Sequence, residues 1–163
     1  MRSLLHLNSF QVYNLLLIVL FSIIVNDNNS FSLIYFSFYC TFHFFLIYLG
    51  LYYYRKLLYL IYFLYGLGLD ILWLNEIGPH LLVFMFVLVF FNLSSKYLYN
   101  LNSFKIYIIL LILQLLMISS EILFSYLLFG FNFDLTYLIE IIVLSLILSF
   151  PIFLIFSKID QLK

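Results

Sequence analysis

Long apolar segments fill most of this chain, and short polar stretches separate them. A helix needs about 20 apolar residues to cross the hydrocarbon core of a bilayer, with roughly 17 to 25 tolerated. Six segments meet that length, and the stretches between them are too short to form a further domain. The pattern predicts one all-α domain over residues 1–163, a polytopic membrane protein with six transmembrane helices. The predicted helices cover about residues 9–25, 31–54, 57–74, 77–93, 104–129 and 135–156.

The composition agrees with a lipid environment. Of the 163 residues, 67% are hydrophobic and 9% are charged, whereas soluble domains have about 45–50% apolar and about 25% charged residues. Seven basic and seven acidic residues give a net charge of zero, and nucleic-acid binding needs a basic face. The lipid bilayer is therefore the expected partner, and nucleic acid is not.

The basic residues predict the orientation of the six helices. Lys and Arg concentrate in the cytoplasmic loops of membrane proteins. With six helices and a cytoplasmic N-terminus, all seven basic residues fall on the cytoplasmic side. The charged residues of the outer loops are then all acidic. The basic residues are Arg2, Arg55, Lys56, Lys96, Lys105, Lys158 and Lys163. Both termini are therefore predicted to be cytoplasmic.

Three carboxylates interrupt the predicted helices. A carboxylate at the centre of a membrane helix costs about 2.5 to 3.5 kcal/mol, so it signals either a function or a buried structural contact. In the predicted orientation Asp70, Glu121 and Glu140 lie in the outer half of the membrane, and His80 lies there at the start of the fourth helix. Structural and functional roles both stay open for these four side chains.

Helical spacing predicts which residues share a face with these acids. Gly66 and Asp70 are four residues apart, so Gly66 would let a neighbouring helix approach just below the carboxylate. Gly78 and the following proline are typical of a helix start, because a proline there loses no hydrogen bond. On the fifth helix, the residues predicted to share a face with Glu121 are Gln114, Met117 and Ser125.

Motifs for catalysis and for metal binding are missing from the sequence. Asp70, Glu76 and His80 combine two carboxylates with one imidazole, but no HExxH pattern accompanies them. Ser-x-x-Lys and Gly-x-Ser-x-Gly motifs are also absent, and neither His6 nor His43 has an evident partner. The sequence therefore predicts no enzyme, no cofactor and no metal ion.

One stretch resembles a known family. The run FLYGLGLDILWLNEIGPHLLVFMFVLVFF is similar to the hairpin of MreD, the bacterial rod shape-determining membrane protein, in which a Gly-x-x-x-Asp helix is followed by a polar turn, a glycine and another apolar helix. The matching positions are Gly66, Asp70 and Gly78. The six-helix layout, the short loops and a proline in the last helix, here Pro151, are similar as well.

The resemblance implies a multi-pass protein of the bacterial inner membrane, a non-catalytic subunit of the complex that synthesises lateral peptidoglycan during cell elongation. Its implied partners are MreC-like, MreB-like and RodA-like proteins and class B penicillin-binding proteins. We hypothesise that Asp70 and Gly66, with the turn from Glu76 to His80, contact a partner helix such as that of MreC.

A small-molecule uptake subunit is the alternative hypothesis. The substrate-binding component of energy-coupling-factor transporters is similar in its six helices and its outward polar pocket. Asp70, His80, Glu121 and Glu140 would line such a pocket in this chain. The Ala-x-x-x-Ala docking face common on the first helix of those components is absent from residues 9–25.

Overall fold

The computed structural model describes the backbone of residues 2–26, 33–53, 56–74, 77–98, 103–130 and 135–161 and the side chains of most of these. All regular structure in these ranges is helical, as predicted. The helices are α1 Arg2–Asn26, α2 Leu33–Tyr52, α3 Leu57–Leu74, α4 Pro79–Leu98, α5 Ser103–Phe129 and α6 Leu135–Gln161. The bounds of α2, α3 and α5 lie within two residues of the predicted ones, whereas α4 continues five residues beyond the predicted end at residue 93. At the two ends of the chain, α1 starts earlier and α6 continues further than the apolar runs alone predict.

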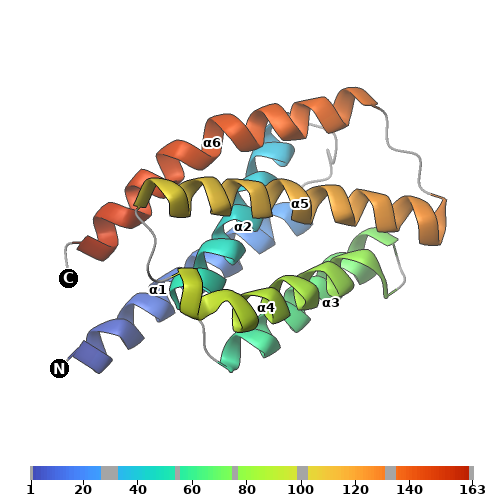
Figure 1. Cartoon of the computed structure of the whole chain (residues 1–163). Helices are drawn as coiled ribbons and strands as arrows, with labels where there is room; N and C mark the ends of the chain where they lie inside the picture. The colour runs from blue at the N-terminus through green and yellow to red at the C-terminus, as the bar shows by residue number, and fades with distance from the viewer. Residues whose placement is uncertain are drawn as a thin grey trace.

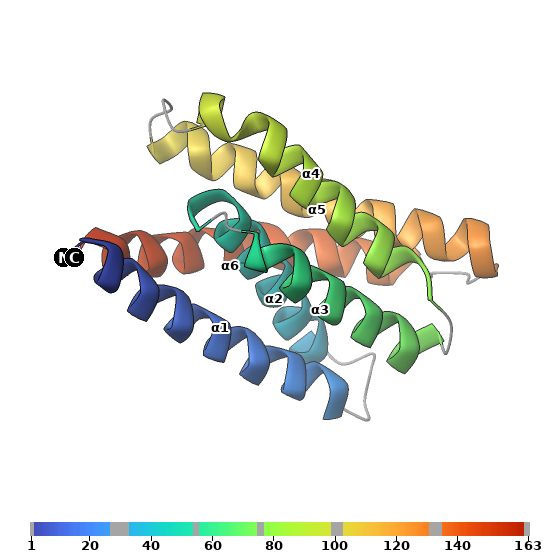
Figure 2. The ribbon, with the colours of Figure 1, turned by 90° about the horizontal axis from the view of Figure 1, so that it is seen from below.

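α2 is the central helix of the bundle. It packs against α1, α4, α5 and α6, so it lies in the middle of both views (Figures 1 and 2). Every residue from Phe42 to Leu51 is buried. This is the most enclosed helix that is also long and apolar enough to span a membrane, so its polar side chains must find partners inside the protein.

α3 and α4 form an antiparallel hairpin along one side of α2. The two helices pack on each other, α4 also contacts α2 and α5, and α3 also contacts α1. The chain termini lie together at the opposite end of the bundle from the α3–α4 turn (Figures 1 and 2). The hairpin is therefore held between α1 on one side and α5 on the other.

Aromatic rings fill the interior at the end that carries the termini. Tyr13 packs edge-on against Phe45, Tyr53 and Phe156, with ring centroids 5.2 to 5.6 Å apart. Such edge contacts add about 0.5–1.5 kcal/mol beyond the burial of area. The sequence contains no alanine, and large rings take the place of the close contacts between small residues that often join membrane helices.

The outer surface of the bundle is apolar. Leu15, Ile34, Phe86, Phe104 and Leu135 are each 62 to 72% exposed. Three helical stretches in the described ranges, Leu33–Tyr52, Phe104–Phe129 and Leu135–Lys158, are long and apolar enough to cross a membrane, and the other apolar stretches are shorter. Exposed apolar patches of this extent mark surfaces that contact lipid or other proteins, so the fold has the surface of a membrane protein.

Candidate functional site: a buried polar chain across four helices

Asp70 binds the N-terminus of α4. Its side chain is fully buried. The backbone N–H groups of Gly78, His80 and Leu81 each donate to its carboxylate at 3.0 Å, and His80 Nδ1 donates to Oδ1 at 2.8 Å. Four donors thus converge on one carboxylate, which satisfies both oxygens without any contact outside the chain.

The local sequence explains this capping. Gly78 precedes Pro79, the first residue of α4, so it stands at the N-cap position, where a side-chain oxygen usually accepts the N–H of the second or third helical residue. Glycine has no such oxygen, and Asp70 supplies it from the preceding helix. A negative charge also suits the partial positive charge of a helix N-terminus. Asp70 therefore fixes where α4 begins and how α3 lies against it.

Gly66 allows the two helices of the hairpin to approach closely. A Cβ atom at Gly66 would lie 2.8 Å from the Cα of Leu81 and 3.1 Å from its backbone nitrogen. The neighbouring helix predicted to approach at Gly66 is therefore α4 of the same chain. Gly66, Asp70 and Gly78, the three positions of the predicted motif, form one local unit.

His80 extends the contacts of Asp70 toward the middle of the bundle. While its Nδ1 donates to Asp70, its Nε2 lies 3.4 Å from the hydroxyl oxygen of Tyr39 on α2. The Tyr39 hydroxyl in turn donates to Glu121 Oε2 on α5 at 2.5 Å. A short contact of this kind is typical of a hydroxyl bonded to a carboxylate. The hairpin is thereby connected to α2 and to α5.

His43 completes the series. Its Nδ1 lies 2.8 Å from the backbone carbonyl of Tyr39, which accepts only, so Nδ1 carries the hydrogen. Its Nε2 lies 3.1 Å from Glu121 Oε1 and 3.0 Å from Oε2. We call the five linked side chains the polar chain. Its members are Asp70, His80, Tyr39, Glu121 and His43, and none of them is more than 4% exposed.

A second polar contact joins α2, α5 and α6. Gln114 Nε2 donates to the backbone carbonyl of Cys40 at 2.9 Å and lies 3.4 Å from the Ser145 hydroxyl. Ser145 donates to the Cys40 sulfur at 3.3 Å. Gln114, Met117, Glu121 and Ser125 are all buried, as their predicted common face on the fifth helix requires.

The predicted site residues separate into two groups. Gly66, Asp70, Gly78, His80 and Glu121 come together at the hairpin and the polar chain. Glu140 lies on the exposed surface of α6, apart from them, and Glu76 lies outside the described residues. Because Asp70 and Gly66 are buried against α4, these two residues offer no surface to a partner helix. A contact through the turn from Glu76 to His80 stays a prediction.

The sequence patterns did not identify Tyr39 and His43 as members of the site. His43 was judged to have no evident partner, yet it pairs with Glu121. The signal was available, because the two residues stand four apart inside one apolar segment and so share a helix face. Their partner lies 78 positions away from His43, which no spacing rule within one helix identifies.

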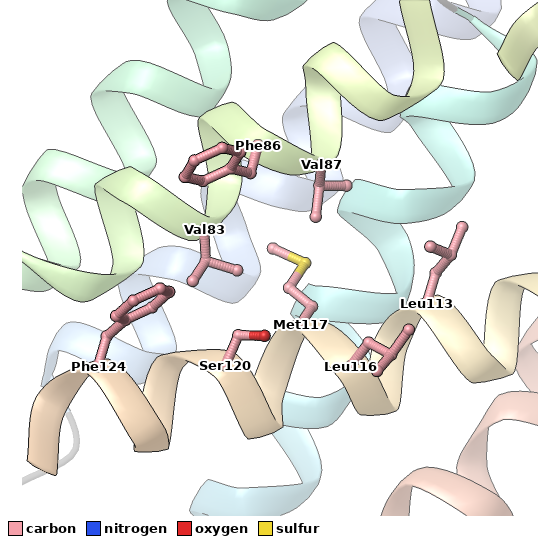
Figure 3. A pocket seen from close by; sticks show the side chains of 8 residues that line it. All are labelled: Val83, Phe86, Val87, Leu113, Leu116, Met117, Ser120 and Phe124. Atoms are coloured by element: carbon pink, nitrogen blue, oxygen red, sulfur yellow. The ribbon is translucent and has the colours of Figure 1, made fainter. Parts of the chain in front are cut away.

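An apolar groove opens between α4 and α5 (Figure 3). Its volume is about 270 Å³. Val83 and Phe86 line it from α4, and Leu116, Met117 and Phe124 line it from α5. Ser120 contributes the one hydroxyl group among the lining side chains. Phe86 and Leu116 are largely exposed, so the groove faces the surroundings of the bundle rather than the polar chain.

The chemistry of the polar chain is that of proton binding. Its groups are carboxylates, imidazoles and a phenol, all of which gain or lose protons. Within the described ranges, no three His, Cys, Asp or Glu side chains are arranged to hold a metal ion. No family model, curated protein sequence or solved structure matches this chain. The site is therefore interpreted from its own geometry.

Replacing Asp70 tests the capping role. In Asp70→Leu, three backbone N–H groups and His80 Nδ1 lose their acceptor in a buried site, so we expect a loss of about 3–5 kcal/mol in the free energy of unfolding. The loss should appear in the purified chain alone, measured by SDS titration in mixed micelles. Glu140→Leu is the matched control, because that carboxylate is exposed, and it should change the value little. Equal stability of the two variants would contradict the capping role.

A pair of glycine substitutions tests the close approach of α3 and α4. Gly66→Ala places a methyl group against the backbone of α4, so we expect a loss of about 1–3 kcal/mol. Gly68→Ala meets only the ring tip of Phe21, a half-buried side chain that can shift at less cost than the backbone of a helix. The thermal midpoint should therefore fall clearly further for Gly66→Ala. A larger effect at Gly68 would show that the hairpin contact is not tight.

Proposed function

We propose that this protein is a non-catalytic scaffold subunit of the bacterial cell-elongation complex, similar to MreD, with six membrane-spanning helices and cytoplasmic termini. The observation that carries the proposal is the hairpin unit. Gly66, Asp70 and Gly78, on which the resemblance rests, meet at the start of α4, where Asp70 caps the helix beside the contact of Gly66 with Leu81. A motif held by such contacts is a structural one, as a scaffold requires.

The placement of charges supports the proposed orientation. Lys56 precedes α3, Lys105 lies in the first turn of α5, and Lys158 lies near the end of α6, and all three are exposed. These helix ends are on the same side of the bundle as the termini (Figure 1). Among the residues described at the opposite ends there is no Lys or Arg. Cytoplasmic placement of the basic end follows from the known bias of membrane proteins.

The shorter apolar stretches are compatible with six spans. The apolar helical stretches Phe10–Asn26, Leu57–Leu72 and Pro79–Ser94 are 16 or 17 residues long, close to the lower limit of about 17 for a spanning helix. Helices slightly shorter than the bilayer are accommodated by local thinning of the membrane or by polar residues at the interface. The packing of α3 against α4 in an antiparallel hairpin fits two such spans.

The α4–α5 groove is the surface we assign to a partner helix. Asp70, Gly66 and Glu121 are occupied by contacts within the chain, so a partner must use other residues. The groove is apolar, faces outward and contains one hydroxyl, that of Ser120. A serine at a helix interface contributes about 0.6 to 2 kcal/mol through a hydrogen bond in lipid. The single transmembrane helix of an MreC-like protein is the proposed occupant.

Labelling of single cysteines tests the orientation. We expect Lys56→Cys and Lys158→Cys to react with a membrane-impermeant maleimide only after the inner membrane is opened. Ile77→Cys, at the exposed start of the hairpin turn, should react in cells whose inner membrane is intact. The native Cys40 is buried and serves as the background. Labelling of Lys56→Cys from the periplasm would exclude the proposed orientation.

Cross-linking tests the proposed partner and its surface together. In cells expressing an MreC-like protein with cysteines along its transmembrane helix, Leu116→Cys in the groove should form a disulfide with it. Leu64→Cys, which is about equally exposed on α3, should not, because that face lies away from the groove. Lack of cross-linking at both positions, together with failure of the two proteins to co-purify in mild detergent, would refute the proposed function.

A further inference from the structure

The contacts of the polar chain determine how many protons it holds. Each of its contacts needs one hydrogen between the two heavy atoms, since two lone pairs facing each other in a buried site are repulsive. Three contacts matter for the count: His80 Nε2 with the Tyr39 hydroxyl, the Tyr39 hydroxyl with Glu121, and Glu121 with His43 Nε2. Together they require three hydrogens.

Only one of these hydrogens comes from a group that is protonated in any case. The Tyr39 hydroxyl supplies it. The ring N–H at Nδ1 of each histidine is already used, by Asp70 for His80 and by the Tyr39 carbonyl for His43. Two of the three contacts therefore lack a hydrogen when both imidazoles are neutral and both carboxylates are ionised.

The net charge of the polar chain also indicates two additional protons. Asp70 accepts three backbone N–H groups at a helix N-terminus, which favours its ionised form. With Glu121 also ionised and both imidazoles neutral, the buried chain would carry two negative charges. A net charge in an apolar interior is strongly unfavourable. Adding two protons brings the net charge to zero and at the same time completes all three contacts.

We propose that the polar chain is a binding site for two protons, in addition to the one ring hydrogen that each neutral imidazole carries. The count does not depend on which atom carries each hydrogen. In one arrangement His80 holds the first proton as an imidazolium. In the other, the hydrogens shift through the Tyr39 hydroxyl, so that Glu121 is protonated and His80 is neutral. The second proton lies between Glu121 and His43, either on the carboxylate or on Nε2 of the imidazole. The ligand is the proton, and His80, Tyr39 and Glu121 form the path along which it is transferred.

Neighbouring groups do not change this balance. From α2, Tyr35 stacks near the Tyr39 ring with centroids 6.5 Å apart, and Cys40 lies one residue further along. Tyr65 of α3 and Tyr137 of α6 contact Phe42 and Phe36 instead. All four add no charge while protonated. Among the described residues, the lysines Lys56, Lys105 and Lys158 are exposed at the other end of the bundle, so none of these three neutralises the polar chain.

Proton binding would control the attachment of the hairpin. His80 and Asp70 belong to α4 and α3, whereas Tyr39, His43 and Glu121 belong to α2 and α5. Loss of one proton leaves one of the three contacts without a hydrogen and leaves a buried negative charge. The inference therefore goes beyond the proposed scaffold function and does not depend on it: the two bound protons complete the contacts that hold the hairpin to α2 and α5.

Counting hydrogens on the two imidazoles and on Glu121 tests the proposal. The full chain, with histidine labelled with ¹⁵N in both ring nitrogens, is placed in lipid nanodiscs near neutral pH. Nitrogen NMR reports which ring nitrogens of His43 and His80 carry hydrogen, and infrared spectroscopy reports a protonated Glu121 carboxyl. We expect a total of four hydrogens, one from each Nδ1 and two bound protons. A total of two or three in the wild-type chain would overturn the proposal.

Two variants make the count specific. In Glu121→Gln, the amide oxygen accepts the Tyr39 hydroxyl and the amide N–H donates to His43 Nε2, so one bound proton is no longer needed. The two rings should then carry three hydrogens. Tyr35→Phe is the matched control, a loss of one hydroxyl one turn away on the same helix, and should keep four. Four hydrogens in Glu121→Gln, or three in Tyr35→Phe, would contradict the proposal.

A metal ion would give a different result. If the wild-type protein retained zinc and both imidazoles bound it through Nε2, those nitrogens would carry no hydrogen, and metal analysis of the purified protein would detect it. That outcome also overturns the proposal. If Glu121→Gln does not fold, the wild-type total and the Tyr35→Phe control still decide between two bound protons and none.

Discussion

The capping of α4 by Asp70 is the interaction on which the arrangement of the helices depends. A helix N-terminus leaves backbone N–H groups without partners, and in lipid no water replaces them. Asp70 satisfies three of these groups and orients His80 in the same place. One carboxylate thus solves the problem of starting a helix within a membrane-like bundle, and it also fixes the imidazole that reaches α2. Its position inside an apolar helix, costly in isolation, is explained by this combination of roles.

The remaining polar side chains follow from the same constraint. A buried polar network is stable only when every member has a partner, because the penalty for an unpaired group rises as the surroundings become less polar. The polar chain meets this condition across four helices. Gln114 meets it in part: its Nε2 donates to Cys40 and lies near Ser145, joining α2, α5 and α6, while its buried Oε1 has no hydrogen-bond partner among the described residues. Apolar packing against lipid does not select one helix partner over another. Polar contacts of this kind therefore decide which helix faces of α2 meet α4, α5 and α6.

Much of the fold was accessible from the sequence, because a membrane helix leaves a simple pattern. The six apolar segments gave the six helices, and the four-residue spacing of Gly66 and Asp70 indicated their common face. The meeting of Gly78 with Asp70 was suggested only through the resemblance to MreD. The pairing of His43 with Glu121 and the role of Tyr39 were not predicted, because contacts between helices far apart in the chain depend on how the helices rotate against one another. Because nearly all faces of α2 are apolar, its sequence does not show which face meets which neighbouring helix.

Glu121 and Glu140 show why composition alone cannot separate a structural acid from a surface one. Both stand in long apolar helices in the half of the bundle away from the termini, and the sequence offered the same two roles for each. Glu121 lies on the helix face that also carries Gln114 and Met117, so it points to α2 and pairs with Tyr39 and His43. Glu140 precedes Ile141, which is buried against α2, and therefore lies on a different side of α6. A shift of one residue along a helix turns a side chain by about 100°, from three to four residues in each turn. The identity of the neighbours on that face, more than the acid itself, determines whether a carboxylate becomes part of the interior.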